Sequence, residues 1–149
     1  MNRGFISEDC KISSAITPTA GVAGVTDING TVIDMAGFEG VLMVVRFGAI
    51  TAGAVTSIKA QQGQQSDGSD AADLLGTGQT IADTDDDKTF YIDLQRPNER
   101  YVRLVVDRGT QNAVVAEAHY MQYGATAKKV THGTNVAGEM HSSPLEGAA

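Results

Sequence analysis

The apolar residues of this chain fall mainly into short runs, and the most apolar run covers residues 38–50. Successive residues of a strand point to opposite faces of a sheet, so this run would present apolar side chains on both faces. One face would carry Val41, Met43, Val45 and Phe47, and the other Leu42, Val44 and Ile50. Flanking glycines and a high valine content favour a strand over a buried helix. We therefore predict a central strand covered on two sides.

Weaker alternating patterns predict further strands at residues 31–35, 55–61, 90–95, 101–107 and 113–123. In the segment 101–107, Val102, Leu104 and Val106 are expected to face inward. Turn signals such as Asn29-Gly30 separate the strands. About seven or eight short strands with turns between them predict an all-β fold, namely a single β-sandwich or jelly-roll-like domain.

The two ends of the chain lack this patterning. Residues 1–18 alternate weakly and stop at Thr17-Pro18, which indicates an N-terminal arm or an edge strand. Residues 125–149 are small and polar, which predicts an extended C-terminal tail. The sandwich domain is therefore expected at residues 19–124. Within it, capping residues at 69–70 and a glycine at 76 predict one or two helical turns over residues 69–76.

Composition restricts the partners of this domain. The chain has 149 residues with 17 glycines and no tryptophan, and its formal net charge is −7. An acidic protein is poorly suited to general nucleic-acid binding, which needs clustered lysine and arginine. No apolar run approaches the roughly 18 residues of a membrane helix. A single cysteine, Cys10, and an acidic N-terminus without an apolar core predict a soluble protein that is made and used without secretion.

The most metal-like feature is the acidic run from Asp83 to Asp87. An EF-hand loop that began at Asp83 would need glycine at its sixth place and glutamate at its twelfth, where this chain has Lys88 and Leu94. We interpret the run as a solvated acidic loop, with a weak cation site as the alternative.

No catalytic or nucleotide-binding motif is present in the sequence. His119, His132 and His141 are too scattered to form a metal-ligand pair by spacing, and His119 is expected to be a packed or interface histidine in a strand. Isolated serine, histidine and aspartate residues do not indicate a hydrolase. We predict a protein that is not an enzyme and that holds no cofactor or metal.

Arginines concentrate in one predicted hairpin, residues 96–108, of this otherwise acidic chain. Arginine and tyrosine are the side chains most enriched in buried protein contacts. The alternative is a solvated strand face on which the arginines alternate with carboxylates. The candidate interface residues are Arg96, Arg100, Tyr101, Arg103 and Arg108 of the hairpin, with His132 and His141 of the tail.

Three segments resemble small structural proteins encoded among the head genes of tailed bacteriophages. They are Arg96–Asn112, the terminus Gly138–Ala149, and Val32–Val41 at the opening of the sheet. The resemblance implies a capsid decoration protein, also called an auxiliary or cement protein. Such proteins are commonly β-rich trimers at the junctions between capsomers. It thus implies the major capsid protein and further copies of the chain as partners, on a capsid surface assembled in host cytoplasm, and no active-site residues.

The expected function is therefore to bind the outside of the capsid and to stabilise the shell against internal DNA pressure. One alternative is another virion component, such as a head fibre, tail or adaptor protein, although a fibre would tend to show repeats and none is found. The other is a carbohydrate-binding jelly roll. With no tryptophan and four tyrosines, the chain offers few aromatic rings for stacking on a sugar.

Overall fold

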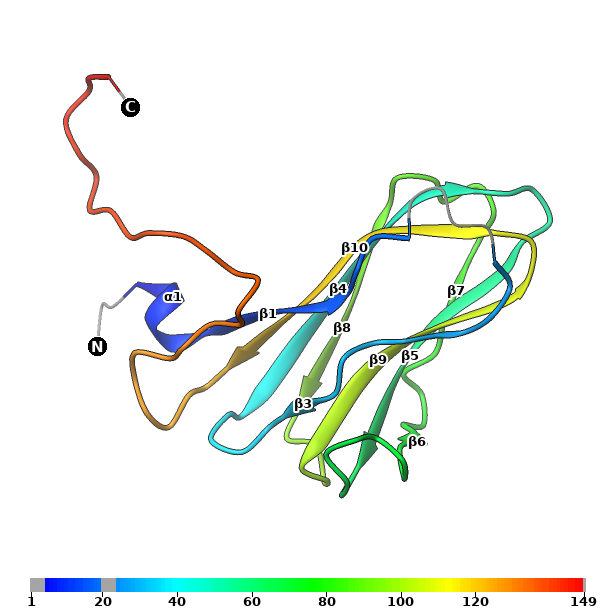
Figure 1. Cartoon of the computed structure of the whole chain (residues 1–149), viewed down its shortest axis with the longest axis horizontal. Helices are drawn as coiled ribbons and strands as arrows, with labels where there is room; N and C mark the ends of the chain where they lie inside the picture. The colour runs from blue at the N-terminus through cyan, green and yellow to red at the C-terminus, as the bar shows by residue number, and fades with distance from the viewer. Residues whose placement is uncertain (1–4, 20–23, 149) are drawn as a thin grey trace.

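The computed structural model describes residues 5–19 and 24–148, which form a two-layer β-sandwich with a projecting tail (Figure 1). Sheet A contains, in spatial order, β1 (Lys11–Ile16), β10 (Ala113–Tyr123), β4 (Gly40–Ile50) and β8 (Thr89–Gln95). Sheet B is centred on β9 (Tyr101–Thr110) and β5 (Val55–Gly63). β2 (Ile28–Asn29) and β3 (Ile33–Asp34) pair with β9, whereas β6 (Ala72–Asp73) and β7 (Gln79–Ile81) pair with β5. All pairings are antiparallel, and the predicted all-β sandwich is confirmed.

β4 lies between β10 and β8, so its predicted central position is confirmed. Its inward face is fully buried, but Leu42 and Val44 on the opposite face are only half-buried. The prediction that both faces are covered was therefore wrong. The reason is that a sandwich has two layers, so the outer face of sheet A has no third layer over it. Ile50 is buried because the pairing of β4 with β10 shifts register near this end.

Inward side chains of the two sheets form one core. The ring of Phe47 packs edge-on against that of Phe90, with the ring centroids 5.9 Å apart. As predicted, Val102, Leu104 and Val106 face inward. Other core residues are Met35, Val41, Met43, Val45, Ile58, Ile92, Val115 and Tyr120.

A tyrosine hydroxyl joins the two sheets through the core. Tyr120 on β10 is fully buried, and its Oη accepts a hydrogen bond from the Leu104 N–H of β9 at 2.9 Å. The same hydroxyl donates to the Thr31 carbonyl at 2.9 Å. Burial raises the pKa of Tyr120 above its ordinary value, so this hydroxyl keeps its proton. Gly30 packs against the same point, where a Cβ would lie 2.7 Å from the Leu104 carbonyl oxygen and 2.8 Å from the hydroxyl.

The predicted hairpin at residues 96–108 is wrong. β8 belongs to sheet A and β9 to sheet B, so the turn between them crosses from one layer to the other. Arg96, the residue directly after β8, adopts φ of 50°, in the left-handed region. Alternation identified both strands correctly, but it carries no information about which strand pairs with which.

The predicted helical turns at residues 69–76 are also wrong, since this segment contains β6 and turns. The Asp70 carboxylate accepts hydrogen bonds from the N–H groups of Gln64 and Gln65, at 2.8 and 3.1 Å, rather than capping a helix. Asp73 then accepts from Lys59 of β5 at 3.0 Å. Pairing with β5 has replaced the local helical preference.

The N-terminal segment contains a short helix, α1 (Ile6–Asp9), that the sequence did not indicate, followed by β1. Of the two alternatives for residues 1–18, residues 11–16 thus form an edge strand of sheet A. The C-terminal tail runs back along α1 and β1 before it leaves the sandwich (Figure 1).

Candidate interaction surfaces

Two of the predicted interface arginines lie in the turn that connects β8 to β9. Arg96 Nη2 lies 2.8 Å from Glu39 Oε1. Arg100 donates from Nε and Nη2 to the two carboxylate oxygens of Asp34, at 2.9 and 2.7 Å. The guanidinium carbon of Arg100 also lies 5.4 Å from the centroid of the Tyr101 ring. Both arginines therefore already have carboxylate partners within the chain.

These ion pairs are open to solvent. The hydrogen bonds from Arg100 hold the pKa of the Asp34 carboxyl below its ordinary value, and the carboxylate raises the pKa of the guanidinium in return. Exposed pairs of this kind stabilise a fold little. They border a groove of about 400 Å³ that includes Phe38 and Gln64. The arrangement presents fixed, alternating charges to any partner at this end of the sandwich.

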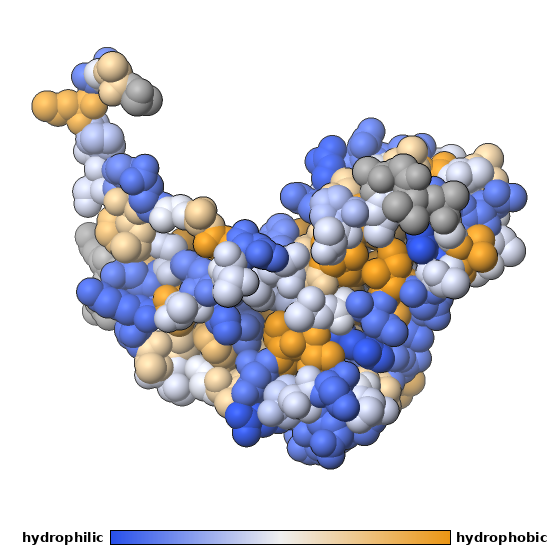
Figure 2. Space-filling view, viewed as in Figure 1, coloured by the Kyte–Doolittle hydropathy of each residue, from blue (hydrophilic) through white to orange (hydrophobic). Residues whose placement is uncertain are grey.

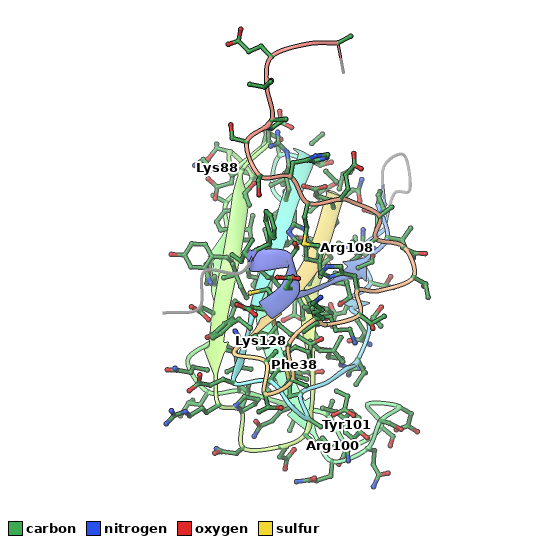
Figure 3. The ribbon with its side chains drawn as sticks, turned by 90° about the vertical axis from the view of Figure 1, so that its left-hand side faces the viewer. Phe38, Lys88, Arg100, Tyr101, Arg108 and Lys128 are labelled. Carbon is green, nitrogen blue, oxygen red and sulfur yellow. The ribbon has the colours of Figure 1, made fainter. Side chains whose placement is uncertain are left out.

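The other two arginines lie elsewhere. Arg108 is 6% exposed, and its Nε donates to the Thr26 carbonyl at 2.9 Å. It is a structural residue that ties β9 to the segment before β2. Arg103 is half-buried and donates to Gln61 Oε1 at 2.8 Å. Figure 3 shows Arg100 and Tyr101 together at one end of the sandwich, with Arg108 well away from them. The four arginines do not form one patch.

The base of the C-terminal tail is hydrogen-bonded to the free edge of β1. His132 Nδ1 accepts from the Ile12 N–H at 3.0 Å, and the Gly133 N–H donates to the Ile12 carbonyl at 2.8 Å. Upstream, the Val130 N–H donates to the Glu8 carbonyl at 3.1 Å. These contacts cover backbone groups that an edge strand would otherwise expose. His132 therefore makes an internal contact.

Beyond Met140 the tail stands clear of the sandwich. Every residue from Ala137 to Ala148 is exposed. His141 lies on this part, with Nε2 3.2 Å from Glu139 Oε1. Leu145 is 97% exposed. Figure 2 shows the tail separated from the body of the molecule, whose visible surface is mostly polar.

The outer face of sheet A is a surface that the sequence analysis did not identify as open. Ile12, Met121 and Leu42 form one row across β1, β10 and β4, and all are half-buried. The next row contains His119 and Val44 and ends at Tyr91, which is 63% exposed. The signal was present as the second apolar face of β4, but it was interpreted as buried. His119 lies on this face, between Ser14 of β1 and Val44 of β4.

A second tyrosine stiffens this face. Tyr123 lies over Gly40 and donates to Asp93 Oδ1 at 2.7 Å. Burial, and then this hydrogen bond, raise the pKa of Tyr123 to about 12. Gly40 is required here, because a Cβ would meet the tyrosine ring.

The acidic run from residue 83 to 87 hydrogen-bonds to backbone groups. Asp86 accepts from the Ile50 N–H at 2.7 Å, and Asp83 accepts from the Gly53 N–H at 2.8 Å. Asp85 accepts from the Ala82 N–H at 2.9 Å. Across residues 5–19 and 24–148, no group of three or more histidine, cysteine, aspartate or glutamate residues is arranged to hold a metal. These carboxylates organise the turn after β4.

In the described part of the chain, no helix has the length and apolar character needed to cross a membrane. The structure thus defines an all-β sandwich with an arginine-carboxylate end, an open apolar sheet face and an exposed tail. Comparison with known protein families, with characterised proteins and with solved structures finds no match for the chain.

Proposed function

We propose that the chain is a structural virion protein that decorates the capsid of a tailed bacteriophage. It forms a homotrimer and binds the outside of the shell at capsomer junctions. Its partners are the major capsid protein and the other copies of itself. The resemblance of three segments to phage head proteins supports this assignment. The observation that carries it is the exposed tail on a well-packed sandwich, a form suited to bridging neighbouring subunits.

The tail supports this function through its energetics. Ordering the backbone of each residue costs about 1–2 kcal/mol. From His141 to Ala148 every residue is exposed, so the isolated chain has little side-chain burial there to offset this cost. A fixed conformation of the tail therefore requires contacts with a neighbouring molecule.

Stabilisation of a shell follows from mass action. A protein that binds only the expanded shell lowers the free energy of that state by RT ln(1 + [L]/Kd), about 4 kcal/mol at a thousandfold excess over Kd. Many copies acting together make even a modest affinity per site effective.

The test compares heads of the encoding phage that carry the protein with heads that lack it, during heating. We expect DNA release at a higher temperature when the protein is bound, and tighter binding to expanded than to unexpanded shells. Equal release temperatures would refute the proposed stabilisation.

Two variants assign the contact surface. In the first, Gly-Ser sequence of equal length replaces residues 139–149, so that the tail attachment at Gly133 is kept. In the second, the charges of the Arg96–Glu39 and Arg100–Asp34 pairs are exchanged, which preserves both internal ion pairs. A shell that recognises these positions should bind the exchanged variant more weakly, whereas full occupancy would exclude this end of the sandwich.

A further inference from the structure

An apolar groove of about 460 Å³ lies between α1, β1 and the base of the tail. Ile12, Val130, Val136 and Met140 supply apolar side chains to its walls, and the charged residues Glu8, Lys129 and Glu139 also line it. No tail residue beyond Met140 lines it. The groove therefore combines apolar surface with one lysine and two carboxylates.

The end of the same tail has the complementary character. Leu145 is almost fully exposed, and Glu146 follows it directly. The tail thus offers one large apolar side chain with a carboxylate beside it.

Of the charged residues that line the groove, Lys129 is the one that can pair with an incoming carboxylate. Lys128 pairs with Asp9 at 2.8 Å, whereas Lys129 has no carboxylate partner among the described residues. Lys129 also adopts φ of 62°, in the left-handed region that a non-glycine residue seldom occupies. Its N–H donates to the Glu8 carbonyl at 3.0 Å, which fixes the backbone in this position.

The chain geometry directs the tail away from its own groove. Met140 lines the groove, and Leu145 follows only five positions later. Pro144 restricts Ser143 to extended conformations. From Gly133, the last residue bonded to β1, to Leu145 the chain can span about 40 Å at roughly 3.3 Å per residue. In Figure 1 the tail leads outward and the C-terminus is its far end.

We propose that Leu145 and Glu146 at the end of the tail dock into the groove of a second copy of this chain. Leu145 occupies the apolar part, and the Glu146 carboxylate pairs with Lys129. Because tail and groove are different surfaces, the contact is head-to-tail and can close into a ring of copies. The inference rests on the proposed self-association, but it requires no shell.

Cross-linking tests the pairing directly. Isotopically labelled and unlabelled copies of the full chain are mixed, and a carbodiimide joins lysine to carboxylate without a spacer. We expect a linked Lys129–Glu146 peptide pair in which one peptide is labelled and the other is not. Pairs of uniform isotope content would show that the tail folds back onto its own groove, and absence of this link would show no docking. Either result overturns the proposal.

Substitution tests the energetic contribution. Leu145→Asp should weaken self-association by roughly 10–100-fold, the factor expected for one buried leucine. The matched control is Leu75→Asp, because Leu75 is equally exposed at 103% but lies before β7 in sheet B. Sedimentation equilibrium measures the self-association of both variants, and circular dichroism checks that each one is folded. Equal effects of the two substitutions, or a wild-type protein that stays monomeric, would overturn the proposal.

A mixture of two variants separates docking between copies from docking within one. Leu145→Asp copies keep the groove, and Val136→Asp copies keep the tail. Each alone should associate more weakly than the wild-type protein, whereas the mixture should form dimers through the one intact tail-groove pair. No dimers in the mixture would overturn the proposal. Since no capsid is present, either failure leaves shell binding as a separate question.

Discussion

The buried hydroxyl of Tyr120 should account for a measurable part of the stability of the sandwich. Tyr120→Phe removes one oxygen atom and leaves the ring in place. The hydroxyl makes two hydrogen bonds of 2.9 Å, from the Leu104 N–H and to the Thr31 carbonyl. Leu104 is fully buried, so no water can replace the lost partner of its N–H group. Thr31 is exposed, and its carbonyl can bind solvent instead.

The expected loss follows from this difference. An unsatisfied buried donor costs about 1–3 kcal/mol, and the exposed carbonyl adds little. We therefore expect the free energy of unfolding to fall by about 2–3 kcal/mol. For a domain of this size, roughly 2–4 °C per kcal/mol corresponds to a fall in Tm of about 4–12 °C.

Urea unfolding followed by circular dichroism measures this effect. The midpoint should fall while the slope m stays the same, because the surface exposed on unfolding is unchanged. Tyr91→Phe is the matched control, since Tyr91 is 63% exposed and its hydroxyl makes no hydrogen bond to the described residues. The control should change stability by no more than about 0.5 kcal/mol. An equally small change in Tyr120→Phe would refute the structural role of the hydroxyl.

Three further predictions follow from other parts of the fold. Gly30→Ala should destabilise the protein by about 1–3 kcal/mol in urea unfolding, because its Cβ would lie 2.7 Å from a β9 carbonyl oxygen, whereas Gly78→Ala has open space and should be neutral. Because the pKa of Asp34 is lowered in the folded protein, its pair with Arg100 stabilises the fold above about pH 4, and this stabilisation is lost as the pH falls through the folded-state pKa. Arg100→Met should therefore reduce the fall of Tm at acid pH, and an unchanged profile of Tm against pH would contradict this. A glutamate-specific protease should cut the free protein after Glu139 faster than trypsin cuts the tail base that is bonded to β1. Mass spectrometry of samples taken at successive times should show this order, and equal rates would contradict the attachment.

The strands were predictable because one fully buried face imposes a strict alternation on the sequence. β4, β5 and β9 show it clearly, and the inward residues predicted for β9 are confirmed. Sheet membership was not predictable, because it depends on contacts between residues distant in the chain. β8 and β9 are joined by a short turn, yet they lie in different sheets. Similarly, the local preference for a helix at residues 69–76 did not take account of the contact between Asp73 and Lys59 of β5.

The interface prediction relied on residue type, and the structure shows what residue type leaves out. An arginine can contribute to binding only to the extent that its charge and its hydrogen-bond donors are not already paired within its own chain. Arg108 is buried against the Thr26 carbonyl, and Arg100 is held by Asp34. A partner of this end of the sandwich must therefore compete with existing ion pairs or bind beside them. Leu145 faces no such competition, since its side chain is exposed and its burial by a partner is favourable. For this chain, the unsatisfied tail is a stronger indicator of an interface than the density of arginine.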